Sequence, residues 1–126
     1  MSHKILVVDD EPEIVKILEK FLRSSGFEVL TAPGGQEAIE ILRSPDEIDL
    51  MIVDIKMPGV TGINVLGELK ESDRKLPVII LSGSIGLQEN VNKIKELGYQ
   101  EKDIVYKPID LYMLLDMVKK KLPQEV

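Results

Sequence analysis

The chain has 126 residues, of which 44% are hydrophobic and 30% charged, a composition typical of a folded globular protein. Its formal net charge of -6 argues against a nucleic-acid surface, because phosphate backbones are bound by clusters of Lys and Arg. The absence of cysteine and the presence of a single histidine, His3, exclude disulfide frameworks, thiol catalysis and zinc sites built from Cys or several His. No apolar stretch is long enough for a membrane span, so we expect one cytoplasmic domain over residues 1–126.

Residues 5–8 form the first predicted strand, a run of branched apolar side chains that ends abruptly at Asp9. Such a continuous run is typical of a strand buried on both faces. Pro12 then stands where a helix can begin, and apolar residues recur at helical spacing as far as Leu22. Gly26 can adopt the left-handed conformation that ends a helix. This segment therefore predicts a strand followed by a helix.

The same pattern recurs four more times along the chain. Further strands are predicted at residues 27–31, 50–53, 78–81 and 104–106. The helices that follow them are predicted from Gly35 to Leu42, after Gly62, from Leu87 to Gly98 and from Leu111 to Val118. Five strand-then-helix units in succession predict an α/β fold, a parallel sheet with helices on both faces.

Polar side chains capable of chemistry stand at the carboxyl ends of four predicted strands: Asp9 with Asp10, Asp54, Ser82 and Lys107. In an open parallel sheet these ends form the ligand crevice. Each residue has a simpler interpretation as a helix cap, a turn residue or a solvated charge, but none of these explains the convergence. Three carboxylates in one crevice repel each other, and a hard divalent cation such as Mg²⁺ is their natural counter-charge.

Together these residues resemble the receiver domain of response regulators in two-component signalling. The resemblance extends from Lys4 to about the last helix and rests on Asp9-Asp10, the segment 54–59 followed by Gly62, Ser82, and Lys107-Pro108. It implies a flavodoxin-like, doubly wound fold with a five-stranded parallel sheet in the order 2-1-3-4-5. The implied function is to accept a phosphoryl group with the help of Mg²⁺ and to switch conformation.

The resemblance implies a role for each residue of the site. Asp54 resembles the phosphoacceptor, a carboxylate nucleophile. Asp9 and Asp10 resemble the acidic pair that holds Mg²⁺, with Asp10 favoured as the direct ligand and Mn²⁺ as an alternative ion. The backbone carbonyl of Lys56 is expected to add a further oxygen ligand. Lys107 resembles the lysine that pairs first with Asp54 and then with a phosphoryl oxygen.

Ser82 resembles the switch hydroxyl that moves to bond the phosphoryl group, and Gly83 is expected to leave room beside that group. Several positions depart from the commonest family pattern. Ile104 stands where an aromatic residue is common, three residues before the lysine, and the stretch from Gly98 to Lys107 is slightly longer than usual. Tyr106 is not at the same position. We therefore expect the loop from Ser82 to Gly86 to carry most of the conformational shift.

A histidine kinase or histidine phosphotransferase is the implied phosphodonor. The family's docking rim corresponds to the first helix and the loop after the fifth strand, here Ile14, Ile17, Pro108 and Ile109. For Ile14, a place in the core is a serious rival interpretation.

The last helix carries a second apolar set, Tyr112, Met113 and Met117, which predicts either deep burial or contact with a partner. The resemblance favours a homodimer or output partner on the fourth helix, fifth strand and fifth helix.

Three alternatives share parts of the pattern. A flavodoxin-like module for a nucleotide or flavin would need a Gly-rich phosphate loop, and neither G-x-x-x-x-G-K-S/T nor G-x-G-x-x-G occurs. A Mg²⁺-dependent phosphohydrolase with an Asp nucleophile typically places a second Asp two residues later, where this chain has Lys56. A degenerate receiver is disfavoured because every residue of the site is present. We expect no enzyme activity beyond self-catalysed phosphorylation and dephosphorylation.

Overall fold

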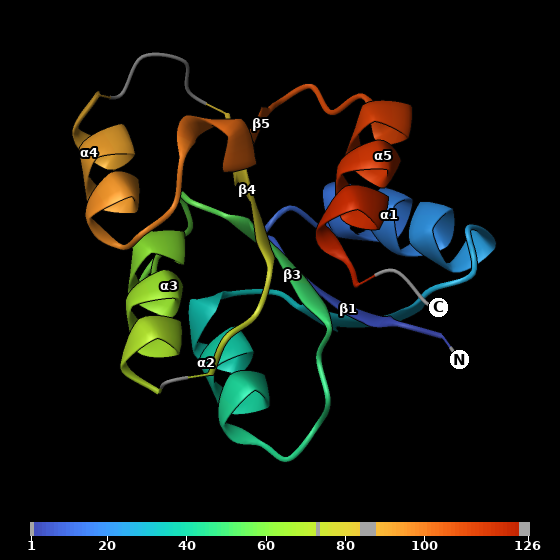
Figure 1. Ribbon diagram of the computed structural model, residues 1–126, viewed down its shortest axis with the longest axis horizontal. Coiled ribbons are helices and arrows are strands. Elements are labelled where there is room, and N and C mark those ends of the chain that lie inside the picture. The colour runs from blue at the N-terminus through green and yellow to red at the C-terminus, as the bar shows by residue number, and fades with distance from the viewer. Residues whose placement is uncertain (1, 73, 84–87, 124–126) are drawn as a thin grey trace.

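The computed structural model describes residues 2–72, 74–83 and 88–123 as one sheet flanked by helices (Figure 1). The strands are β1 (Lys4–Val8), β2 (Glu28–Ala32), β3 (Leu50–Asp54), β4 (Val78–Ser82) and β5 (Ile104–Tyr106). The helices are α1 (Pro12–Ser24), α2 (Gly35–Arg43), α3 (Gly62–Glu71), α4 (Gln88–Glu96) and α5 (Leu111–Lys121), and a 3-10 helix, η1 (Glu101–Asp103), precedes β5. All strands pair in parallel in the order β2-β1-β3-β4-β5, which confirms the predicted fold.

Helices cover both faces of the sheet, with α1 and α5 on one side and α2, α3 and α4 on the other (Figure 1). Side chains of a strand alternate between the two faces, so β1 supplies two cores. Leu6 and Val8 are buried in the core under α2, α3 and α4, whereas Ile5 and Val7 are buried in the core under α1 and α5. The uninterrupted apolar runs of the sequence follow from this two-sided burial.

Most predicted boundaries agree with the structure to within a residue. Gly26 and Gly98 adopt φ values of 97° and 96° at the ends of α1 and α4, as predicted for left-handed helix ends. β2 begins one residue later than predicted, because the N–H of Phe27 donates to the carbonyl of Leu22 and completes the turn after α1. The predicted helix start at Leu87 lies outside the described residues.

Gly62 fixes the path of the chain after β3. A Cβ atom at this position would lie 2.2 Å from the carbonyl oxygen of Asp54, so no side chain fits. The N–H of Gly62 also donates to the carbonyl of Ile55 over 3.1 Å. The first turn of α3 therefore packs directly on the end of β3 and holds Asp54 at the sheet edge.

The outer surface of α5 corrects one alternative from the sequence. The predicted deep burial is wrong for Tyr112 and Met113, because their exposed fractions are 80% and 55%. Met117 is partly buried against the core under α1 and α5.

Ile104, the first residue of β5, is buried at 9% exposure. No helix in the described part of the chain is both long and apolar enough to cross a membrane.

Candidate functional site

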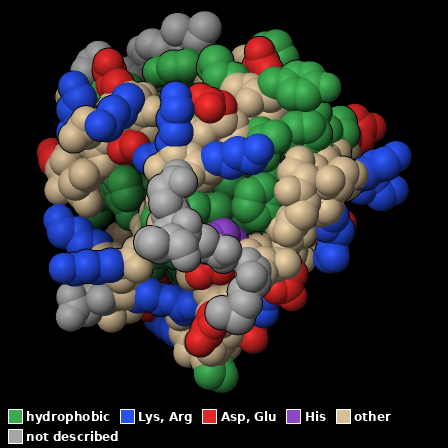
Figure 2. Space-filling model, turned by 45° about the vertical axis from the view of Figure 1, so that its right-hand side comes forward, with side chains coloured by type: hydrophobic (Ala, Val, Ile, Leu, Met, Phe, Trp, Pro, Cys, Tyr) green, Lys and Arg blue, Asp and Glu red, His purple; other side chains and the backbone are tan. Residues whose placement is uncertain are grey.

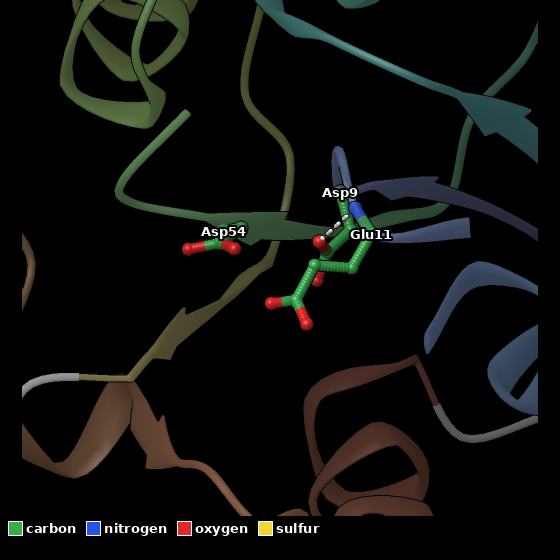
Figure 3. A group of neighbouring side chains, drawn as sticks. All are labelled: Asp9, Glu11 and Asp54. Atoms are coloured by element: carbon green, nitrogen blue, oxygen red, sulfur yellow. Dashed lines mark hydrogen bonds between the residues drawn. The ribbon is translucent and has the colours of Figure 1, made fainter. Parts of the chain in front are cut away.

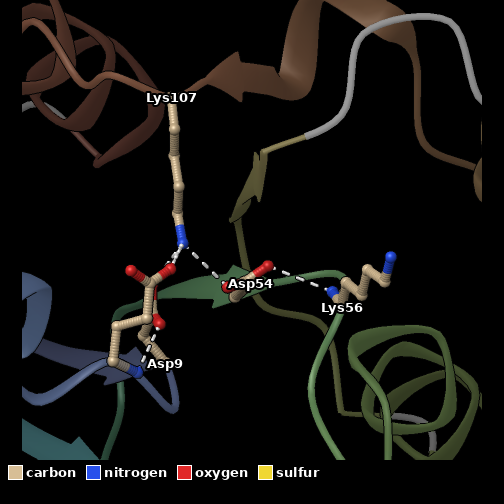
Figure 4. Close-up of polar contacts among 5 residues, drawn as sticks. Asp9, Asp54, Lys56 and Lys107 are labelled. Carbon is tan, nitrogen blue, oxygen red and sulfur yellow. Dashed lines mark hydrogen bonds and ion pairs between the residues drawn. The ribbon is translucent and has the colours of Figure 1, made fainter.

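Four of the predicted site residues meet at the carboxyl edge of the sheet. Asp9 directly follows β1, Asp54 and Ser82 are the last residues of β3 and β4, and Lys107 directly follows β5. Because parallel strands end on the same edge, these positions lie together although they are spread over most of the chain. The Lys107 side chain reaches from β5 across to the ends of β1 and β3 (Figure 4).

The ammonium group of Lys107 is the centre of the site. Its Nζ lies 2.6 Å from Glu11 Oε1, 2.9 Å from Asp54 Oδ2 and 3.2 Å from Asp9 Oδ2. Burial by itself would lower the pKa of Lys107. Hydrogen bonds to Glu11 and Asp54 and the charges of Asp54 and Asp9 outweigh burial, so the pKa is raised and the lysine stays protonated.

Asp54 is buried, and each of its carboxylate oxygens has one donor. Oδ1 accepts from the backbone N–H of Lys56 over 3.0 Å, and Oδ2 accepts from Lys107. The Lys56 side chain is exposed and points away from Asp54 (Figure 4). Asp54 is thus oriented by two donors, one of which is the Lys107 ammonium group that also lies beside Asp9 and Glu11.

Asp9 is buried at 1% exposure, and only one of its two carboxylate oxygens accepts a hydrogen bond. Its Oδ1 accepts from the backbone N–H of Glu11 over 2.9 Å, but Oδ2 has no hydrogen-bond partner within the described residues. The distance from Oδ2 to Lys107 is that of an ion pair without hydrogen-bonding geometry. Burial raises the pKa of Asp9, the charge of Asp54 adds to it, and the Glu11 N–H and Lys107 offset only part.

The described residues bring three carboxylates together: Asp9, Glu11 and Asp54, each with an oxygen within 4.8 Å of the others (Figure 3). Oxygen donors of this kind suit Mg²⁺, and the buried Oδ2 of Asp9 lacks a hydrogen-bond donor that a cation would replace. The residues present therefore fit a divalent cation.

Glu11 was not included in the site predicted from the sequence, and the position of the Asp10 side chain was left open there. Glu11 stands in extended conformation just before α1, so it returns to the side of Asp9, whereas Asp10 is exposed and outside the group of carboxylates. Counting two residues on from the buried Asp9 would have pointed to Glu11. The metal-ligand roles of Asp10 and of the Lys56 carbonyl stay predictions.

Ser82 is half-buried beside this group, and its carbonyl accepts from the N–H of Lys107 over 2.8 Å. This bond ties the start of the predicted switch loop to the lysine. A Cβ atom on Gly83 would lie 3.9 Å from the Lys107 Cδ, an ordinary contact. Residues 84–86 of the predicted switch loop lie outside the described residues.

An apolar pocket adjoins the site between α1 and the segment after β5. It has a volume of about 310 Å³, and its lining includes Ile14, Ile17, Lys107, Pro108 and Ile109. The peptide bond between Lys107 and Pro108 is cis. Figure 2 shows hydrophobic side chains gathered in the upper part of the face on which α1 and α5 lie. The four residues of the predicted docking rim thus line one pocket.

Comparison with known proteins agrees with this geometry. Residues 5–119 match the family described as the response regulator receiver domain. The chain is 34% identical to sporulation initiation phosphotransferase F of Bacillus subtilis, over 98% of this chain and 96% of that protein. It is 37% identical to response regulator GtcR of Aneurinibacillus migulanus, of whose length it spans only 43%.

A solved structure extends the comparison to three dimensions. The response regulator TrrA from Thermotoga maritima, crystallised in complex with Mg²⁺-BeF, aligns with a TM-score of 0.82 at 33% identity. The alignment covers 95% of this chain and 99% of that one.

Proposed function

The chain belongs to the response regulator receiver domain family, and from this premise we propose that Asp54 is the phosphoacceptor and that the carboxylates around it hold Mg²⁺. Receiver domains are phosphoacceptor modules of two-component signalling rather than classical enzymes. One observation carries the assignment to Asp54. It is the buried carboxylate that receives a hydrogen bond from Lys107 within a group of acidic residues.

The chemistry assigned to this chain is phosphoryl transfer from a histidine. An oxygen of Asp54 forms a bond to phosphorus while the bond from phosphorus to the histidine nitrogen breaks, and the electron pair of that bond stays on the imidazole. The N–H of Lys56 orients the carboxylate, and Lys107 moves from the Asp54 oxygen to a phosphoryl oxygen, whose charge it balances. Dephosphorylation by water is the only other reaction assigned to the site.

Asp9, Asp10, Asp54 and the carbonyl of Lys56 are the proposed ligands of Mg²⁺, with Mn²⁺ as the alternative ion. When bound, the cation would offset the charge of the carboxylates and of the phosphoryl oxygens. The unpartnered Oδ2 of Asp9 supports its inclusion.

The proposed phosphodonor is a histidine kinase or histidine phosphotransferase that docks over the apolar pocket beside Lys107. Ile17 supports this role because its side chain is 51% exposed on the rim. Ile14 is partly buried against the core and also lines the pocket, so it serves both packing and docking. An apolar rim next to a buried carboxylate suits a partner that excludes water while the phosphoryl group moves.

The proposed output is an equilibrium that phosphorylation shifts through Ser82 and Gly83. The exposed Tyr112 and Met113 support a homodimer or output partner on the surface formed by α4, β5 and α5. A cytoplasmic location is proposed on family membership.

A phosphohydrolase is the main alternative. It would need an acid–base group two residues after the nucleophile, and there the Lys56 side chain points away from Asp54 (Figure 4). The test is incubation with acetyl phosphate and Mg²⁺, followed by peptide mapping and by assay on phosphomonoesters. One phosphoryl group on Asp54, absent from Asp54→Asn, and no sustained turnover are expected. Modification at another residue, or sustained hydrolysis, would contradict the proposal.

The docking rim needs its own experiment. Ile17→Glu is expected to slow phosphotransfer from the protein donor while leaving the acetyl phosphate rate unchanged, because only the protein donor needs the rim. Lys16→Glu, at an exposed neighbour outside the pocket lining, is the matched control. Equal slowing with both donors would indicate misfolding instead of lost docking.

A further inference from the structure

Glu11 is the residue that holds Lys107 most closely. An ammonium group has three N–H donors, and that of Lys107 has three carboxylates within 3.2 Å. The shortest distance, 2.6 Å, is to Glu11 and not to the proposed phosphoacceptor. In the unphosphorylated protein the lysine therefore donates to Glu11 and Asp54, and its charge also faces Asp9.

The three carboxylates differ in how firmly they are held. The side chains of Asp9 and Asp54 are 0% and 5% exposed, and each accepts a hydrogen bond from a backbone N–H. The Glu11 side chain is 58% exposed, and its carboxylate contacts no backbone donor among the described residues. Glu11 is therefore the member of the group that can leave at the smallest cost, because water replaces its one contact.

A phosphoryl group on Asp54 would arrive beside Glu11. The two residues have carboxylate oxygens within 4.8 Å of each other, so the new anionic group would meet the Glu11 charge at short range. The phosphoryl oxygens and Glu11 would also compete for the same ammonium donors. In the starting state, Glu11 thus stabilises an arrangement of Lys107 that the phosphorylated state cannot keep.

We infer that Glu11 is a positioning residue that restrains phosphorylation. It holds Lys107 in the unphosphorylated protein and swings out to solvent when the aspartyl phosphate forms. This inference rests on the proposed role of Asp54. It adds a fourth carboxylate to Asp9, Asp10 and Asp54, with a task different from that of the acidic pair.

Three variants separate the contact from the charge. Glu11→Gln keeps the shape and removes the charge, whereas Glu11→Asp keeps the charge and draws it back from Lys107 by one methylene. Glu13→Gln removes an equal charge from the exposed first turn of α1 and serves as the matched control. Glu11 caps α1 without a side-chain hydrogen bond, so neither change at this position removes a helix cap.

The measurement is the initial rate of Asp54 phosphorylation by acetyl phosphate, at a Mg²⁺ concentration that saturates each variant. Glu11→Gln is expected to raise the rate about twofold to fivefold, the size of one partly exposed ion pair. Glu11→Asp is expected to raise it as well, and Glu13→Gln to leave it unchanged. An unchanged or lower rate in Glu11→Gln, or a Glu11→Asp rate equal to that of the unaltered protein, would overturn the inference.

A second readout follows the contact itself. Exchange of the Lys107 ammonium protons with water, followed by nitrogen-15 NMR, is expected to be faster in Glu11→Gln and unchanged in Glu13→Gln. Loss of Mg²⁺ binding in Glu11→Gln would make Glu11 a metal ligand and overturn the restraint. If the unaltered protein takes a phosphoryl group on Asp54 and Glu11→Gln matches its rate, only the restraint fails. If the unaltered protein takes none there, the proposed function itself fails.

Discussion

Two lysine–aspartate pairs lie at opposite ends of β5, and they differ in how completely the aspartate is satisfied. Before the strand, Asp103 accepts a hydrogen bond from Lys121 on Oδ1 and one from the N–H of Gln100 on Oδ2. After the strand, Lys107 lies beside Asp9, whose Oδ2 has no hydrogen-bond partner within the described residues. Both aspartates are buried, so burial alone does not distinguish them.

The pKa directions of the two aspartates are opposite. Burial acts first on both and raises the pKa. At Asp103 the hydrogen bonds from Lys121 and Gln100 outweigh burial, so the pKa is lowered. At Asp9 the Glu11 N–H and Lys107 do not outweigh burial and the repulsion from Asp54, so the pKa is raised. At Asp103 both carboxylate oxygens have a donor, whereas at Asp9 one buried oxygen lacks a donor among the described residues.

The largest expected effect is on the completed pair. Asp103→Ala is expected to lower the free energy of unfolding by about 2–3 kcal/mol, because it leaves the half-buried Lys121 and the N–H of Gln100 without their acceptor. Asp116→Ala removes an exposed i,i+4 partner of Lys120 and is the control, with an expected loss below about 0.5 kcal/mol. Urea denaturation measures both. Equal losses would remove the distinction between completed and exposed pairs.

Mg²⁺ comes next. At ten times its dissociation constant, the ion is expected to raise the free energy of unfolding by about 1.4 kcal/mol, because it binds only the folded protein. Thermal unfolding with and without Mg²⁺ would show the gain in the unaltered protein and its loss in Asp9→Asn. The same titration of Asp10→Asn tests the predicted direct ligand. A melting temperature indifferent to millimolar Mg²⁺ would count against the site.

Asp9→Asn without Mg²⁺ is expected to stabilise the protein by about 1 kcal/mol, the reverse of the effect at Asp103. The substitution removes a buried charge that burial and Asp54 both disfavour. Urea denaturation in the presence of a chelator is the measurement. A loss of stability in this variant would mean that the ion pair with Lys107 outweighs the repulsion.

The smallest effect is on the pH dependence of stability, and it has opposite signs at the two aspartates. With its pKa lowered in the folded state, Asp103 contributes stability that is present above its ordinary pKa of 3.8 and is lost as the pH falls through the folded-state pKa. Asp9, whose pKa is raised, contributes stability that is present below 3.8 and is lost as the pH rises through its folded-state pKa. The free energy of unfolding is therefore measured against pH without Mg²⁺. Its loss toward acid pH should be smaller in Asp103→Ala than in the unaltered protein, and larger in Asp9→Asn.

Local patterns in the sequence were enough to predict the strands and the positions at their ends. Each apolar run is flanked by a polar residue or a turn former, so β3 was predicted to end at Asp54 and β5 to cover residues 104–106, as the structure has them. The strand order came from the family resemblance and not from any local pattern. The start of β2 was one residue early because Phe27 is apolar but bonds back to Leu22.

Only the tertiary structure decided which of the three consecutive acidic residues lie beside Lys107, namely Asp9 and Glu11. Asp9 and Asp10 are identical in type, and Glu11 differs by one methylene, so composition cannot rank them. The backbone after β1 turns Asp10 to solvent and brings Glu11 back over Lys107, a residue that lies 96 positions away in the sequence. The exposure of Tyr112 was equally undecided, because a helix with two apolar stripes shows only after packing which one the core takes. Side-chain direction at the end of a strand depends on contacts between distant segments, and no local pattern encodes those contacts.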